Sequence, residues 1–165
     1  MHYHHQSEYE TKNNPYQTFI ILIGIAAITF LLWEPHLEGR NVNASLLQIY
    51  FNDPFLAFVY FASIPFFMVL YQAFKVLELA GKNNLISKET LKRLRLIKNY
   101  AISIIAFTVI GVIIIFLNES DDRTGGVFMG MLVIITSILI AISVSNFERN
   151  LKNRLNENCN IDSAE

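Results

Sequence analysis

Few residues of this chain have side chains that could do chemistry, and most of them fall in polar stretches. The hydroxyls within the apolar stretches have no nearby histidine or carboxylate to act as a base, so they indicate helix contacts rather than nucleophilic catalysis. The single cysteine, Cys159, cannot form an intramolecular disulfide. No hydrolase, phosphate-binding or dinucleotide-binding motif is present in the sequence. We therefore predict a non-enzymatic protein with no catalytic residue and no cofactor.

Metal binding is the second kind of chemistry for which the sequence offers candidate residues. His2, His4 and His5 form a histidine-rich start, but no second group of ligands accompanies them, which favours weak adventitious binding. Carboxylates and one imidazole also gather in two later connections, where they could bind a cation if they converged. Nothing in their spacing requires convergence, so we interpret them as parts of solvated loops and predict no metal site. These residues are Glu34, His36, Glu38, Asp53, Glu119, Asp121 and Asp122.

A cluster of basic residues in another connection is the strongest candidate for an interaction site. Ser87 is predicted to be the N-cap of a short helix, and Glu89 falls in its first turn, where the helix dipole favours an acid. Cations on this helix can contact anionic lipid, at about 1 kcal/mol each near the membrane surface, or can dock a cytoplasmic protein partner. The lipid interpretation is the simpler one, and both can hold together. The cations concerned are Lys88, Lys92, Arg93, Arg95 and Lys98.

The elements that position these residues follow from the composition. Of 165 residues, 53% are apolar and 16% are charged, whereas an average globular domain has about 25% charged residues. Four apolar runs each approach the roughly 20 residues that cross a bilayer, and too few polar helices remain to cover them in a soluble fold. Inside lipid these runs must be helical, because their backbone hydrogen bonds have to close internally. The formal net charge of -1 also argues against a nucleic-acid partner.

Helix boundaries carry local signals. Asn14-Pro15 and Asp53-Pro54 are typical helix starts, with a capping side chain followed by proline at the first helical position. Thr124 is predicted to cap the fourth helix. The first helix is predicted to end before Pro35, since the residue preceding a proline is biased out of the helical region. Pro65 predicts a kink within the second helix.

The distribution of basic residues predicts the orientation. Eleven of the 13 Lys and Arg residues fall in the N-terminus, the central connection and the C-terminal tail, and two fall in the other connections. By the positive-inside rule, both termini should be cytoplasmic. The predicted fold is therefore an all-α integral membrane four-helix bundle. Its segments are a polar N-terminus (1–15), spanning helix 1 (16–33), an outer loop (34–52), spanning helix 2 (53–73), a basic connection with a short helix (74–98), spanning helix 3 (99–117), an acidic outer loop (118–124), spanning helix 4 (125–146) and a cytoplasmic tail (147–165).

Small residues in the fourth helix predict a close packing contact. Gly126 and Gly130 form a G-x-x-x-G pattern, which lets helices approach closely in lipid, either within one chain or between copies of a homo-oligomer. No charged residue lies in the middle of any predicted spanning helix, whereas ion-coupled transporters normally need one. A small oligomeric transporter or pore that uses this glycine face is the alternative to an interaction or regulatory subunit.

An ordered set of short motifs also resembles a known family. The set runs from Glu38-Gly39-Arg40-Asn41 through Ser63-Ile64-Pro65-Phe66-Phe67 to Asp121-Asp122-Arg123-Thr124-Gly125-Gly126. It is similar to the bacterial membrane family catalogued as domain of unknown function 2975. The resemblance implies a bacterial inner membrane, four membrane helices and no assigned activity, and some relatives lie beside small helix-turn-helix regulators. Relatives often carry a cysteine near the start of the third helix, where this chain reads Asn99-Tyr100.

Overall fold

The computed structural model describes residues 15–37, 54–117 and 123–162, and regular structure within these ranges is α-helical. The helices are α1 (Pro15–Leu37), α3 (Pro54–Gly81), α4 (Lys88–Leu117) and α5 (Arg123–Asp162). Each contains an apolar stretch long enough to cross a bilayer. Within the described residues, the predicted all-α fold with four helices long and apolar enough to span a membrane is therefore confirmed.

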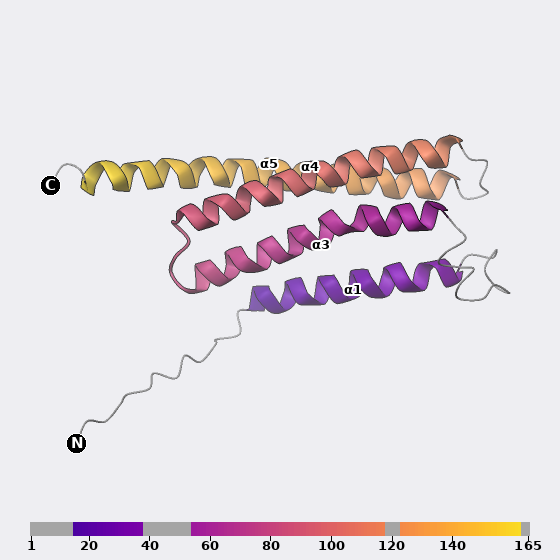
Figure 1. The fold of residues 1–165 in the computed structure, drawn as a ribbon, viewed down its shortest axis with the longest axis horizontal. Coiled ribbons are helices and arrows are strands. Elements are labelled where there is room, and N and C mark those ends of the chain that lie inside the picture. The colour runs from indigo at the N-terminus through magenta and orange to yellow at the C-terminus, as the bar shows by residue number, and fades with distance from the viewer. Residues whose placement is uncertain (1–14, 38–53, 118–122, 163–165) are drawn as a thin grey trace, which may run out of the picture.

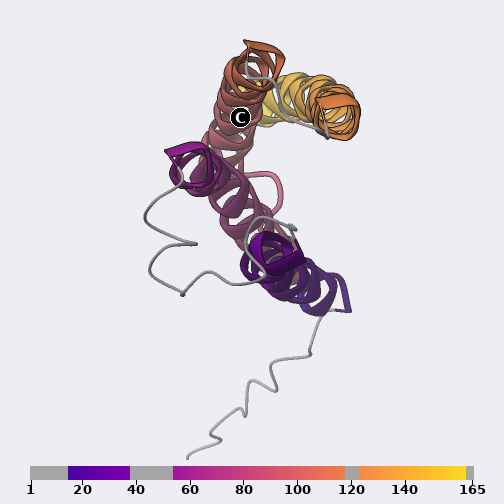
Figure 2. The ribbon, with the colours of Figure 1, turned by 90° about the vertical axis from the view of Figure 1, so that its right-hand side faces the viewer.

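The four helices pack in chain order as one open, curved row. The extensive contacts are α1 with α3, α3 with α4 and α4 with α5, and the end view in Figure 2 shows that the row does not close on itself. The arrangement is thus more open than the predicted bundle. Lipid tails are as apolar as leucine, so no hydrophobic force drives the outer helices together. A row is stable in lipid where it would not be stable in water.

The contact between α4 and α5 follows one continuous seam. From Val127 to Glu157, the α5 residues that are not exposed recur at alternating steps of three and four residues, which is the 3.5-residue repeat of paired helices. They are Val127, Gly130, Ile134, Ser137, Ala141, Val144, Glu148, Leu151 and Leu155. The α4 side of the seam includes Leu94, Ile97 and Ala101, which are at most 5% exposed. The best-buried part of the molecule therefore lies near the start of α4.

This seam carries the helices well past the apolar stretches. The predicted basic connection over 74–98 is mostly helical, because α3 runs to Gly81 and α4 begins at Lys88. The predicted tail is also helical as far as Asp162, and Figure 1 shows the end of α5 projecting past the α3–α4 turn. At 1.5 Å per residue, α5 is about 60 Å long, about twice the hydrocarbon thickness of a bilayer.

Local signals fix the turn between α3 and α4. Asn83 adopts a positive φ of 54°. The Asn84 amide donates to the Leu79 carbonyl at 2.9 Å, and the Asn83 amide donates to the Ala80 carbonyl at 3.1 Å. These are the two hydrogen bonds of a Schellman motif, with asparagine in the left-handed position. At the other end of the turn, the Thr90 amide donates to Ser87 Oγ at 3.2 Å, which confirms Ser87 as the N-cap of α4.

Two of the predicted helix limits were wrong. Helix α5 begins at Arg123, so Thr124 lies inside it and is not its cap. Helix α1 continues through Pro35 to Leu37. A proline at position 35 removes the amide that would bond the Leu31 carbonyl, and the hydroxyl of Tyr60 on α3 donates to that carbonyl at 3.0 Å instead. A neighbouring helix thus satisfies the freed carbonyl, as the bilayer interior requires.

Candidate interaction surface at the charged end

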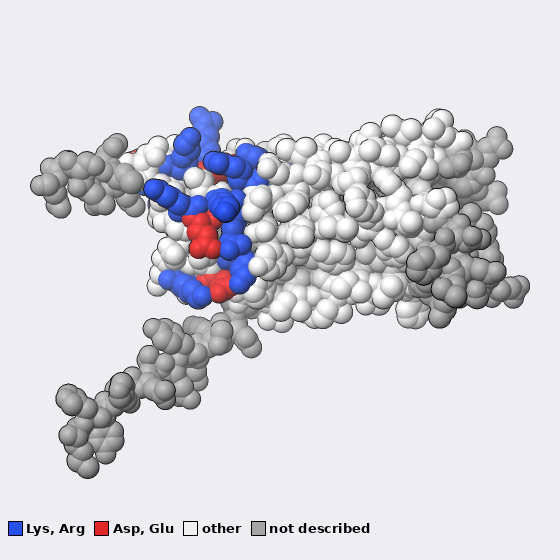
Figure 3. Space-filling model, in the orientation of Figure 1, with Lys and Arg blue, Asp and Glu red and all other residues white. Residues whose placement is uncertain are grey.

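The charged side chains that the structure describes gather at one end of the molecule. They lie where α3 ends, where α4 begins and along the last turns of α5, and Figure 3 shows them as a band beside an uncharged body. We call this region the charged end. It holds Lys75, Glu78, Lys82, Lys88, Glu89, Lys92, Arg93, Arg95, Lys98, Glu148, Arg149, Lys152, Arg154 and Glu157.

Glu148 joins α4 to α5 within the charged end. Its two carboxylate oxygens accept from Lys98 Nζ at 2.6 Å and from Arg95 Nε at 3.1 Å. The Glu148 side chain is 13% exposed, and its hydrogen bond to Lys98 is the main cause that lowers the pKa of the carboxyl group. Because both cations come from α4, this cluster holds the α5 extension against the start of α4.

Arg93 joins α3 to α4 in a similar way. Its Nη1 donates to the side-chain oxygen of Gln72 at 3.0 Å, and its Nη2 donates to Glu89 at 2.7 Å. Gln72 is 7% exposed, so the hydrogen bond satisfies a buried acceptor, which would be costly to leave unpaired. Arg93 therefore has a structural role that its basic character alone does not indicate.

The third group of ion pairs lies at the end of α3. Glu78 accepts from Lys75 at 2.8 Å and from Lys82 at 2.7 Å. These two ammonium groups, the hydrogen bond from Lys75 first, lower the pKa of Glu78 to about 2. The carboxylate is therefore ionised throughout the physiological pH range, and its charge is balanced locally.

These ion pairs divide the predicted cations into two classes. Arg93, Arg95 and Lys98 are engaged within the chain, whereas Lys88 and Lys92 have no carboxylate partner among the described residues. Sequence reasoning missed a further set of cations on α5 that also has no partner there; its members are Arg149, Lys152 and Arg154. The sequence does show Arg149 and Lys152 close to Glu148. The pairing of Glu148 with Arg95 and Lys98 of α4, however, follows no local spacing rule.

The predicted packing glycines lie against α4 of the same chain. A Cβ at Gly130 would overlap Cγ2 of Val112, and one at Gly126 would come within 3.0 Å of Cδ1 of Ile115. The close approach that the G-x-x-x-G pattern allows is therefore made within the chain. A homo-oligomer would have to use a different face.

The residues that the sequence offers as possible metal ligands lie outside the described side chains. Glu38, Asp53 and the acidic 118–122 segment lie outside the described residues, as do His2, His4 and His5, and the side chains of Glu34 and His36 are also outside them. Among the side chains that are described, no group of three or more histidine, cysteine or acidic residues could hold a metal ion. Among the described residues, the charged end is therefore the candidate functional site.

Comparison with known proteins agrees with this architecture. The family model described as "Protein of unknown function (DUF2975)" matches residues 39–153. The chain is 31% identical over 136 residues to "Uncharacterized membrane protein YoaS" of Bacillus subtilis (strain 168), a match that covers 81% of this chain and 84% of that protein. No solved structure matches. The matched region contains the whole α3–α4 turn and the ion-pair cluster around Glu148.

Proposed function

The chain belongs to the family described as protein of unknown function DUF2975, and we propose that it is a non-enzymatic membrane subunit that docks an acidic cytoplasmic protein at its charged end. The observation that carries the proposal is the pair Lys88 and Lys92, which lie exposed on the first turns of α4 without a carboxylate partner among the described residues.

The proposed orientation places the charged end in the cytoplasm of a bacterial cell. The first residues of α1, the α3–α4 turn and the last residues of α5 all lie at this end (Figure 1). The described side chains there comprise ten Lys and Arg residues against four Glu residues, a net charge of +6. An excess of Lys and Arg close to membrane helices marks the cytoplasmic side. The arrangement therefore supports cytoplasmic N- and C-termini.

Lys88 and Lys92 are well placed for a protein rather than for the bilayer. They lie ten and six residues before Lys98, which directly precedes the apolar stretch of α4. At 1.5 Å per residue they project about 15 Å and about 9 Å beyond that boundary. The Ser87 cap and the fully buried Thr90 hold these first turns in place. A rigid helical surface costs a partner little ordering entropy.

The charge arrangement favours an acidic partner. Glu78, Glu89 and Glu148 are each held by cations of the same chain. Their charges are balanced internally, so the residues left to interact with a partner are mainly positive. Complementary charge speeds diffusional encounter and suppresses wrong partners. A surface of this kind selects acidic proteins over basic ones.

The proposal is tested by reversing the two exposed charges. In Lys88→Glu/Lys92→Glu, recovery of a cross-linked cytoplasmic partner from native membranes should fall at least about tenfold, since each removed rim charge becomes a repulsive one. The matched control is Lys152→Glu/Arg154→Glu, which makes the same change in net charge at the same end, at two α5 cations that likewise have no carboxylate partner among the described residues. Equal recovery with the wild-type chain and both variants would refute the docking surface, and so would equal loss in both variants.

A further inference from the structure

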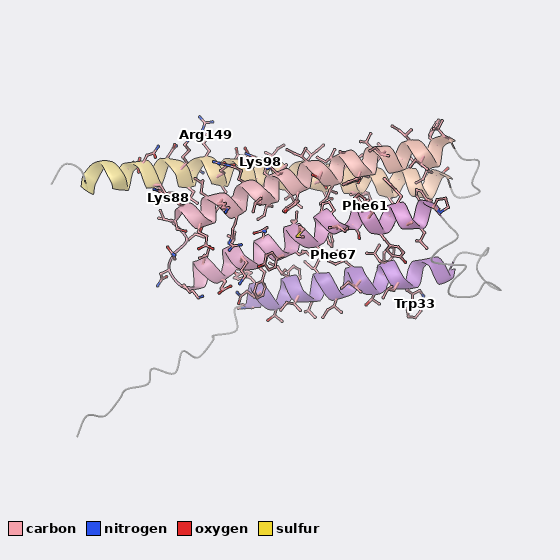
Figure 4. The ribbon with its side chains drawn as sticks, in the orientation of Figure 1. Trp33, Phe61, Phe67, Lys88, Lys98 and Arg149 are labelled. Carbon is pink, nitrogen blue, oxygen red and sulfur yellow. The ribbon has the colours of Figure 1, made fainter. Side chains whose placement is uncertain are left out.

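A second cationic surface lies at the boundary between the charged end and the apolar body, along one flank of the α4–α5 seam. Arg95 and Lys98 of α4 meet Glu148 of α5, and Arg149 follows directly on that residue. Figure 4 shows Lys98 and Arg149 at a similar position along the α4–α5 pair. Because the helices are antiparallel, Lys152, three residues after Arg149, lies further along α5 in the direction of the α4 start. We call Arg95, Lys98, Arg149 and Lys152 the boundary cluster.

The boundary cluster has an excess of positive charge. Glu148 lies between its four cations and accepts hydrogen bonds from two of them, which leaves a net charge of +3. Neither Arg149 nor Lys152 has a carboxylate partner among the described residues. A guanidinium beside ammonium groups is the usual arrangement for binding a phosphate, since it offers planar paired donors together with point charges.

The position of the boundary cluster relative to the apolar stretches of α4 and α5 indicates which phosphate compound it can bind. Lys98 directly precedes the apolar stretch of α4, and Arg149 follows that of α5 by only three residues. Two helical turns into the apolar body, on the same faces, Ile102 lies seven residues after Arg95 and Ile142 lies seven residues before Arg149. Both isoleucines are 54% exposed. A positive surface thus continues directly into an exposed apolar one.

We propose that the boundary cluster binds the phosphodiester headgroup of an anionic phospholipid, whose acyl chains lie over Ile102 and Ile142. Free phosphate would use only the cationic half of this surface, and an acidic protein would not need the apolar half. The Glu148 ion pairs position Arg95 and Lys98, while Arg149 and Lys152 supply the uncompensated charge. The lipid would bridge α4 and α5 on the flank where the two helices are exposed.

The proposal is independent of protein docking, because it uses other residues at another depth. Its natural control is Arg154, which is also an exposed α5 cation. At about 100° per residue, Arg154 lies about 140° around the helix from Arg149. It lines a separate shallow hollow together with Asn150, Asn153 and Glu157. Removing its charge changes the net charge of α5 without touching the boundary cluster.

The test compares full-length protein in nanodiscs made of phosphatidylcholine with a small fraction of phosphatidylglycerol, and native mass spectrometry counts the phosphatidylglycerol molecules that stay bound. Arg149→Gln/Lys152→Gln should bind this lipid about 25-fold more weakly than wild type, from a factor of about five for each cation. Arg154→Gln should bind as wild type does. Circular dichroism checks that all variants keep the same helix content.

Three outcomes would overturn the proposal. The first is unchanged retention of phosphatidylglycerol in the double variant. The second is a loss of about fivefold in Arg154→Gln, the same loss per charge as in the double variant, which would mean that net charge alone attracts the lipid. The third is full displacement of the lipid by millimolar inorganic phosphate, which would assign the cluster to a free anion. If the double variant instead lost binding of a poly-glutamate peptide while retaining the lipid, the cluster would be a protein site.

Discussion

Replacing the two glycines of α5 with alanine should have unequal effects on stability, although both belong to the same G-x-x-x-G pattern. A Cβ at Gly130 would overlap Cγ2 of Val112, and a β-branched side chain in a helix has one strongly preferred rotamer. Val112 therefore cannot turn away without strain. A Cβ at Gly126 would be tight only against the terminal methyl of Ile115, at 3.0 Å, because the other two Ile115 atoms near it lie at ordinary contact distances of 3.6 and 3.9 Å. That flexible end can move by a few tenths of an ångström.

The expected difference in stability between the two variants follows from two opposing effects, overpacking and helix propensity. Overpacking a closely packed contact costs about 1–3 kcal/mol, and this cost applies to Gly130→Ala. The gain in helix propensity from glycine to alanine, about 1 kcal/mol, applies to both variants and cancels when they are compared. Gly130→Ala should therefore be about 1–3 kcal/mol less stable than Gly126→Ala. Adding Val112→Ala to Gly130→Ala should recover part of the difference, because it removes the clashing methyl group.

The assay is equilibrium unfolding in mixed micelles with increasing sodium dodecyl sulfate, followed by circular dichroism. Gly81→Ala is the reference for a substitution without steric conflict, because nothing lies within 4 Å of the added Cβ. Equal unfolding midpoints for Gly126→Ala and Gly130→Ala would refute the packing of this face against α4. The glycines would then be available for contacts between copies of the chain.

Three further perturbations test local parts of the account. Ser87→Ala removes the N-cap of α4 and should cost about 1 kcal/mol in the same unfolding assay, whereas Ser87→Asp should cost much less; equal losses would mean that Ser87 is not the cap. The pKa of Glu148 lies below its ordinary value of 4.5, so its stabilising contribution is present above about pH 4.5 and is lost as the pH falls through the folded-state pKa. Lowering the pH below about 4.5 should therefore reduce the protection of the α5 amides after Glu148 against hydrogen exchange, relative to the intrinsic exchange rate at each pH, more in wild type than in Glu148→Gln. An identical pH response of the two proteins would contradict the ion-pair cluster. Cys159, the single cysteine, should react with a membrane-impermeant maleimide only after cells are opened, and labelling of intact cells would reverse the proposed orientation.

The sequence predicted the helices better than it predicted their lengths. Apolar runs located all four spanning segments, since lipid leaves the backbone no alternative to a helix. The end of the apolar run, however, predicts that the fourth spanning segment ends at Asn146. The helix continues to Asp162 because Leu151 and Leu155 extend the same 3.5-residue repeat into water. That repeat was visible in the sequence, but a search for apolar length alone does not detect it.

The candidate site was only partly predictable for a different reason. The basic residues before α4 were identified from composition, and Ser87 from its capping pattern. Their division into engaged and exposed cations depends on contacts between helices, such as that of Arg93 with Gln72. No spacing rule within one helix encodes such a contact. For the same reason, Arg149 was not identified as a site residue. Its place in the boundary cluster depends on the contact between Glu148 of α5 and Lys98 of α4.

The docking of an acidic cytoplasmic protein is tested most directly by site-specific photo-cross-linking in native membranes. A photoreactive residue at position 92, and in parallel one at position 154, would be activated in native membranes mixed with cytosol, at low and at high salt, and the adducts identified by mass spectrometry. At position 92 we expect one recurrent cytoplasmic protein, joined through an acidic segment. This adduct should not form at high salt, and it should be absent at position 154. Recovery of only the chain itself from position 92, or the same set of adducts from both positions, would contradict the proposed function.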